Sequence, residues 1–298
     1  MLKKSLKEAL LISTILVEKR MEQLLPQNFH GSQLVAAMRY SALSGGKRIR
    51  PFLLMATAEM LGTPATTCVN AAAAIEFIHS YSLIHDDLPA MDDDDFRREQ
   101  PSCHKKFDEA TAILAGDALL TLAFEILSNP DTHKEAHICC ELINVLAKSS
   151  GFRGMVGGQM IDLETSHTKL SKEQIANMHR QKTGELFMAS SEMGAILGRA
   201  GKESRMSLRY FAHDLGLAFQ IRDDILDHQG NNELKVEIDE QAHKKLKENA
   251  SIVDVVGLEA AHQQLDLLCE QAIAHLQNFG VKADILRELA QFVAKSEK

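Results

Sequence analysis

The stretch Asp86–Asp95, which reads DDLPAMDDDD, places six carboxylates within ten residues. A second acidic group, Asp223–Asp227 with the sequence DDILD, follows much later in the chain. The chain around both groups is apolar and typical of helices. Carboxylate oxygens concentrated at two points of such a chain indicate that a cation binds between them. The alternative interpretation is that each group is an ordinary solvated acidic turn.

The second acidic group has the simpler geometry. Positions i and i+4 of an α-helix lie about 40° apart around the axis. Asp223 and Asp227 therefore point the same way, and Asp224 flanks the face that they share.

The first acidic group cannot lie on one continuous helix. Pro89 lacks an N–H and disfavours helical geometry at Leu88, so we expect the helix to end there and a short bulge to bring Asp92 back. Both groups then offer hard oxygen ligands. Such ligands suit Mg²⁺, which typically binds through one or two carboxylates together with water and substrate phosphates.

Basic residues accompany the acidic groups. The segment Gly45–Pro51, GGKRIRP, combines two glycines that let the backbone approach an anion with cations that would attract a phosphate. Arg97 and Arg98 follow directly after the first acidic group. Each element alone could be surface decoration, but side by side they suit a substrate with a charged head and a metal bridge.

Composition predicts a single all-α domain over residues 1–298. The chain is 45% hydrophobic and holds only 6 Pro and 17 Gly, and no alternating strand pattern is separated by turn dipeptides. Helices are expected near residues 1–25, 32–44, 50–62, 66–88, 107–128, 133–150, 155–165, 171–200, 204–228, 251–278 and 282–295.

Charge and cysteine content exclude several function classes. A net charge of −8 argues against nucleic acid as a partner. Five cysteines without a Cys-x-x-Cys pattern suit a reducing cytoplasm, and His79, His85 and His104 match no common zinc motif. The apolar stretch at residues 9–17 is flanked by acids and predicts an amphipathic helix rather than a signal peptide. No stretch is predicted to be a membrane span.

These motifs together resemble the trans-polyprenyl synthetases, and among them the bacterial farnesyl diphosphate synthases. The resemblance runs in order from about residue 40 to residue 230. It rests on the two acidic groups, Arg97-Arg98, Gly45–Pro51, Gly157-Gly158-Gln159 with Asp162, Lys182-Thr183-Gly184 and Phe219-Gln220.

The resemblance implies a fold, partners and a reaction. The fold would be the all-α isoprenoid synthase fold, a helical bundle around a central cavity, and the protein would be a cytoplasmic homodimer using three Mg²⁺. The reaction would ionise dimethylallyl or geranyl diphosphate and condense the cation with isopentenyl diphosphate to give farnesyl diphosphate. Alternatives are a longer-chain geranylgeranyl diphosphate synthase, a terpene cyclase-like lyase and a non-catalytic subunit.

The resemblance also assigns roles to particular residues. Asp86, Asp92 and Asp223 would bind metal directly, with Asp87, Asp224 and Asp227 close by or reached through water. Thr183 and Gln220 would present oxygens to the carbocation, and the released diphosphate would remove the proton. The allylic diphosphate would be held by Arg97 and Lys182, and isopentenyl diphosphate by Gly46, Lys47, Arg50, His79 and Arg98.

Product length is expected to depend on Tyr81 and Ser82. Tyr81 precedes Asp86 by five residues, which places it about 7.5 Å deeper along a helix, and Ser82 lies one turn below the aspartate. In the family a bulky residue at the position of Tyr81 accompanies fifteen-carbon products.

The chain departs from the family pattern at two places. Relatives usually have Gly after the arginine pair, where this chain has Glu99 and Gln100, a change expected to be tolerated on a loop. The second departure follows Asp227, where Lys235 is predicted to replace a substrate-binding lysine. Residues 228–250 are polar and highly charged, which predicts either a mobile lid or a disordered loop.

Overall fold

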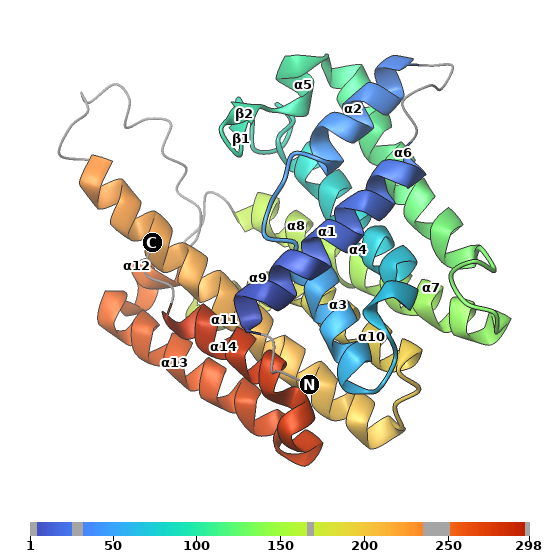
Figure 1. The fold of residues 1–298 in the computed structure, drawn as a ribbon. Helices are drawn as coiled ribbons and strands as arrows, with labels where there is room; N and C mark the ends of the chain where they lie inside the picture. The colour runs from blue at the N-terminus through green and yellow to red at the C-terminus, as the bar shows by residue number, and fades with distance from the viewer. Residues whose placement is uncertain (1–4, 26–31, 166–169, 235–250, 296–298) are drawn as a thin grey trace. The chain divides into compact units, whose positions relative to one another are not determined.

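The computed structural model describes residues 5–25, 32–165, 170–234 and 251–295. It contains two compact units (Figure 1). The first comprises Met1–Ala147 with Ser190–Gly201, and the second comprises Lys148–Ala189 with Lys202–Lys298. The sequence-based expectation of one domain over residues 1–298 remains a prediction.

The first unit is a helical bundle built around α4. Its elements are α1 (Leu6–Leu24), α2 (Ser32–Ala42), α3 (Ile49–Met60), the 3₁₀ turn η1 (Ala65–Thr67), α4 (Val69–Asp86), β1 (Phe96–Arg97), β2 (Gln100–Pro101), α5 (Cys103–Lys106), α6 (Glu109–Ser128), most of α7 (Ala136–Ser150) and the end of α10 (Glu185–Leu197).

Helix α4 is buried on almost every side because its sequence is apolar all round. The run Ala71–Ala74 has no side chain larger than a methyl group, and α1, α2, α3 and α6 all pack against this helix. A helix that is apolar on every face belongs in a core. This burial fixes the position of the carboxyl end of α4, where the first acidic group begins.

The second unit is built around the long helix α11. Its other elements are α8 (Met155–Thr165), α9 (Lys172–His179), the π-helical turn η2 (Arg180–Gly184), the start of α10, α12 (Ile252–Val256), α13 (Leu258–His275), the 3₁₀ segment η4 (Gln277–Ala283) and α14 (Asp284–Lys295), with α11 itself running over Lys202–Leu234. Helices α13 and α14 and the turn η2 pack against α11. The second acidic group therefore lies on a helix that its neighbours hold in place.

Most predicted helices are confirmed to within a few residues. Helix α11 continues to Leu234, beyond the expected end near residue 228. The region predicted as one helix over 251–278 is divided at Gly257, whose φ of +82° is accessible to glycine at little cost. The region predicted as one helix over 171–200 holds the π-helical turn.

A small antiparallel hairpin, β1 with β2, was not predicted. Phe96 pairs with Pro101 and Arg97 pairs with Gln100, so Arg98 and Glu99 form a two-residue turn. Both turn residues have positive φ, +52° and +63°, as this tight hairpin turn requires. The glycine that relatives usually have after the arginine pair would meet that requirement more easily than Glu99.

Helix α6 is long and apolar enough to cross a membrane by length and composition alone, which the sequence-based expectation had not anticipated. Buried core helices of soluble proteins satisfy the same criterion. In this structure α6 buries Ala112, Ala115, Leu119 and Ala123 and packs along α4. We therefore interpret α6 as a core helix of the first unit.

Candidate active site

The first acidic group has the bulged backbone that Pro89 predicts. Helix α4 ends at Asp86, and the chain then loops out and returns, because the backbone N–H of Asp92 donates to the carbonyl of Asp86 at 2.9 Å. The N–H of Asp94 likewise donates to the carbonyl of Asp87 at 3.2 Å. The backbone thus brings Asp92 beside Asp86, as expected.

The carboxylates of this group have different surroundings. Asp87 is buried and accepts a hydrogen bond from Arg97 Nε at 2.9 Å, while Arg97 also pairs with Asp94 at 3.3 Å. Burial raises the pKa of Asp87, and the Arg97 guanidinium partly offsets this shift. Asp86 and Asp92 are only half-buried. Asp87 is therefore the carboxylate that ties α4 to the hairpin.

The second acidic group divides in the same way. Asp223 and Asp227 stand one helical turn apart on α11, half-buried and exposed respectively. Asp224 is 7% exposed and accepts hydrogen bonds from Gln220 Nε2 at 3.1 Å and from the backbone N–H of Ile252 at 2.9 Å. Both oxygens of Asp224 face protein donors.

The arrangement of the carboxylates suits Mg²⁺ bound together with a phosphate. Within the described residues, no three His, Cys, Asp or Glu side chains gather into a site that could hold a metal by themselves. Mg²⁺ seldom needs such a cage, since one or two carboxylates plus water and substrate phosphate oxygens suffice. The pair Asp86 and Asp92 and the pair Asp223 and Asp227 each fit that requirement.

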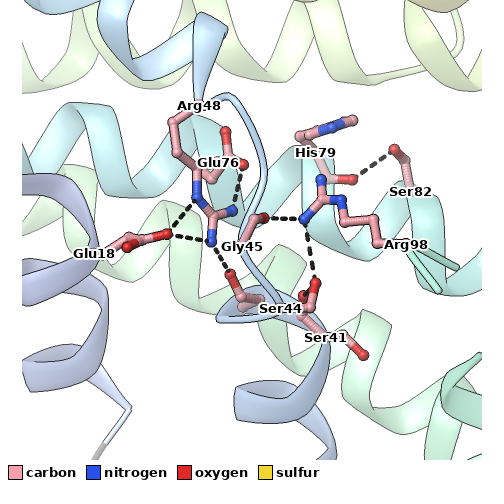
Figure 2. Close-up of polar contacts among 10 residues, drawn as sticks. Glu18, Ser41, Ser44, Gly45, Arg48, Glu76, His79, Ser82 and Arg98 are labelled. Carbon is pink, nitrogen blue, oxygen red and sulfur yellow. Dashed lines mark hydrogen bonds and ion pairs between the residues drawn. The ribbon is translucent and has the colours of Figure 1, made fainter. Parts of the chain in front are cut away.

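A buried arginine holds the basic loop at the start of α3 (Figure 2). Arg48, only 3% exposed, donates to Glu76 at 2.7 Å, to Glu18 at 3.2 Å and to the carbonyl of Ala42 at 2.8 Å. This network connects α1, α4 and the loop. It leaves Lys47 exposed and Arg50 half-buried.

Sequence analysis did not assign a role to Arg48 or to its partners. The signal was present, because Glu76 is a single acid inside the apolar sequence of α4, and a buried acid of this kind requires a cation. The structure identifies that cation as Arg48.

The turn of the hairpin contacts this loop. Arg98 donates to the carbonyl of Gly45 and to Ser44 Oγ, the latter at 3.2 Å (Figure 2). A Cβ atom at Gly46 would lie 2.9 Å from the Arg98 guanidinium, so a side chain there would displace the arginine. Glycine at this position therefore permits the close approach of Arg98.

His79 lies close to the same cations (Figure 2). Burial, followed by the positive charges of Arg50 and Arg98, holds the pKa of His79 well below its usual range. A neutral imidazole among several guanidinium groups is suited to donate one hydrogen bond to an anion. Three of the predicted isopentenyl diphosphate residues, Gly46, His79 and Arg98, are thus close together, whereas Arg97 faces Asp87.

Polar side chains also meet at the π-helical turn of the second unit. Lys182 Nζ lies 2.6 Å from Asp162 Oδ2 on α8, and Thr183 Oγ1 donates to Gln220 Oε1 on α11 at 3.0 Å. A Cβ atom at Gly158 would collide with the backbone N of Lys182. Gly158 therefore lets α8 pack directly against the turn. π-Helical turns are frequent at functional sites.

The predicted chain-length residues lie inside the first unit. Tyr81 is 6% exposed, its ring stands edge-on to His85 with centroids 5.8 Å apart, and burial together with Asp86 raises its pKa to about 12. Ser82 Oγ donates to the carbonyl of His79 at 2.9 Å (Figure 2). Lys235, together with residues 236–250 of the predicted lid, lies outside the described residues.

Comparison with known proteins gives a consistent result. The family model described as polyprenyl synthetase matches residues 32–280. The farnesyl diphosphate synthase of Haemophilus influenzae is 43% identical, with 93% of this chain and 95% of that protein aligned. The Escherichia coli enzyme of the same name is 42% identical, with 92% of each aligned.

Solved structures agree with the sequence relatives. The apo crystal structure of an FPP/GFPP synthase from Zymomonas mobilis superposes with a TM-score of 0.87 and 43% identity. The superposition covers 97% of this chain and 98% of that one.

Proposed function

The chain belongs to the polyprenyl synthetase family, with the all-α isoprenoid synthase fold, and we propose that it forms farnesyl diphosphate. As a prenyltransferase, it would condense isopentenyl diphosphate with dimethylallyl diphosphate and then with geranyl diphosphate. The observation that carries this proposal is the 43% identity to a farnesyl diphosphate synthase over nearly the whole length of both chains. Both acidic groups and the basic loop of this chain are intact.

The carboxylates would hold the Mg²⁺ on which this family relies. Asp86, Asp92 and Asp223 are proposed as direct ligands, with Asp227 nearby and three ions in total. Bound Mg²⁺ would neutralise the charge that develops on the departing diphosphate. Asp87 accepts from Arg97 and Asp224 accepts from Ile252, so we propose that both act mainly by holding neighbouring groups in place.

The protein's cations would hold two different diphosphates. Lys182 would exchange its bond with Asp162 for an oxygen of the allylic diphosphate, and Arg97 would extend from Asp87 toward the same group. Isopentenyl diphosphate would be held by Gly46, Lys47, Arg50, His79 and Arg98. The low pKa of His79 supports this role, because a neutral ring among guanidinium groups gains a favourable partner when an anion arrives.

The oxygens of Thr183 and Gln220 would face the allylic cation after ionisation. The double bond of isopentenyl diphosphate would then attack, and the released diphosphate would take the proton. Tyr81, buried five residues before Asp86, would stop chain growth near fifteen carbons. A homodimer and a cytoplasmic location are proposed from the family alone.

One incubation tests this function. The protein is mixed with Mg²⁺, isopentenyl diphosphate and either dimethylallyl or geranyl diphosphate, and the dephosphorylated products are separated by chromatography. Farnesol is the expected main product. A matched incubation without isopentenyl diphosphate is the control, because a cyclase or lyase would release hydrocarbon from the allylic substrate alone. Predominantly twenty-carbon product would indicate the longer-chain alternative, and no product would contradict catalysis.

A further inference from the structure

Four groups of the second unit form a continuous hydrogen-bonded chain. Thr183 Oγ1 donates to Gln220 Oε1 at 3.0 Å, and Gln220 Nε2 donates to Asp224 Oδ1 at 3.1 Å. The backbone N–H of Ile252 donates to Asp224 Oδ2 at 2.9 Å. The chain thus runs from the π-helical turn, across α11, to the start of α12.

The chemistry of its members allows one direction only. A carboxylate accepts hydrogen bonds and a backbone N–H donates them, so the end formed by Asp224 and Ile252 is fixed. Gln220 must therefore present its NH₂ group to Asp224 and its oxygen to Thr183. Thr183 in turn must donate its hydroxyl proton to Gln220. The lone pairs of Thr183 Oγ1 are then what remains for any further neighbour.

Asp224 is held firmly enough to set this direction. Its side chain is 7% exposed, and Ser251 also hydrogen-bonds to it in addition to Gln220 and Ile252. These donors satisfy a buried carboxylate that would otherwise be costly. By contrast, Asp223 and Asp227 lie on the more exposed part of the helix.

We propose that Asp224 is a positioning residue that acts through Gln220 and fixes the hydroxyl of Thr183 so that its lone pairs, and not its proton, face the allylic cation. This inference rests on the proposed function, which puts Thr183 beside that cation. It replaces the expectation that Asp224 is a metal ligand. A hydroxyl oxygen stabilises a nearby positive charge through its lone pairs, whereas a hydroxyl proton in the same place repels it.

Asp224→Asn is the informative variant, because it keeps the shape of the side chain and reverses the chain of hydrogen bonds. The introduced amide would use its oxygen for the N–H of Ile252 and turn its NH₂ group toward Gln220. Gln220 would then have to present its oxygen to that NH₂ group and its own NH₂ group to Thr183. The hydroxyl proton of Thr183 would be released from its bond.

The expected result is a loss of kcat of at least about tenfold in Asp224→Asn, with KM for both substrates and the Mg²⁺ half-saturation within a few fold of wild type. Thr183→Val should lose a similar factor. The double variant should be little worse than either single variant, because both remove the same interaction. Additive losses would overturn the proposal.

A measurement without turnover separates positioning from metal binding. Mg²⁺ with a non-reactive allylic diphosphate analogue should raise the melting temperature of Asp224→Asn as much as that of wild type. Asp223→Asn, which removes a proposed ligand, should show a smaller rise. If Asp224→Asn loses the Mg²⁺-dependent rise as Asp223→Asn does, Asp224 binds metal and the proposal is wrong.

A second variant keeps the test open if Asp224→Asn does not fold. Gln220→Met has a similar shape, interrupts the chain of hydrogen bonds and leaves the bond between Asp224 and Ile252 in place. It should lower kcat at least about tenfold, with little further loss on adding Thr183→Val. Near-normal kcat in Gln220→Met would overturn the proposal. A wild type that condenses normally with additive variants overturns this inference alone, whereas a wild type that forms no condensation product overturns the proposed function as well.

Discussion

Lys182 Nζ lies 2.6 Å from Asp162 Oδ2, so the lysine proposed to bind the allylic diphosphate is already paired with a carboxylate of α8. This pairing places the ammonium group before substrate arrives. An incoming diphosphate must compete with Asp162 for it.

Lys182→Ala should therefore raise KM for the allylic diphosphate by about tenfold to a hundredfold, the range expected for losing a charged hydrogen bond. KM for isopentenyl diphosphate should stay within a few fold, because its proposed residues lie in the first unit. Steady-state kinetics with each substrate varied in turn checks this. Equal increases in both constants would contradict the assignment of Lys182 to one diphosphate.

Asp86→Ala and Asp223→Ala should each lower turnover by at least roughly two orders of magnitude, the scale lost with a principal electrostatic contributor. The fold should survive, since neither carboxylate is fully buried. Asp93→Asn is a matched control from the same acidic run, because Asp93 is exposed and Asn tolerates its φ of +50°. Correctly folded Asp86→Ala or Asp223→Ala with turnover near wild type in Mg²⁺ would exclude that carboxylate as an essential ligand.

Tyr81→Ala should shift the main product from fifteen carbons to twenty or more. The Tyr81 side chain is 6% exposed and fills volume that a longer tail would need. Tyr81→Phe keeps that volume and should keep the product, even though it removes the hydroxyl. Chromatography of the dephosphorylated products compares the variants. Identical chain lengths in wild type and Tyr81→Ala would leave another residue as the floor.

Glu99→Gly should stabilise the protein by about 1 kcal/mol, because Glu99 has a φ of +63° that glycine adopts without a Cβ penalty. Glu99→Ala removes the same charge but keeps the Cβ atom, so it should give no comparable gain. Urea unfolding of the three proteins measures the difference. A gain shared equally by Ala and Gly would point to charge rather than backbone conformation.

Stability should fall by about 2 kcal/mol between pH 7 and pH 5 through His179. Burial lowers the pKa of His179 from 6.5 to about 4, so below pH 6.5 the unfolded chain takes up a proton that the folded protein excludes. His179→Gln should flatten this part of the profile of unfolding free energy against pH. His262→Gln, at an exposed position, should leave it unchanged. An unaltered profile in His179→Gln would contradict the prediction.

The sequence was sufficient for the long helices and for the bulge after Asp86, because apolar composition and Pro89 act locally. It could not predict the hairpin, since two-residue strands have no measurable period. The ion pairs of Arg48 depend on α1 and α4, which local patterns do not bring together. The difference between Asp223 and Asp224 depends on Ile252, beyond a segment whose sequence gives no register.

The π-helical turn Arg180–Gly184 has a consequence for how this part of the chain tolerates change in length. A wider turn accommodates an additional residue, and each residue rotates an α-helix by about 100°. Removing one residue here would restore regular helix but swing everything after it, including buried Phe187, by that angle about the axis. Substitutions in this turn can be absorbed locally. A deletion cannot, so the working fold depends on the number of residues between Asp162 and Gln220, independently of which residues they are.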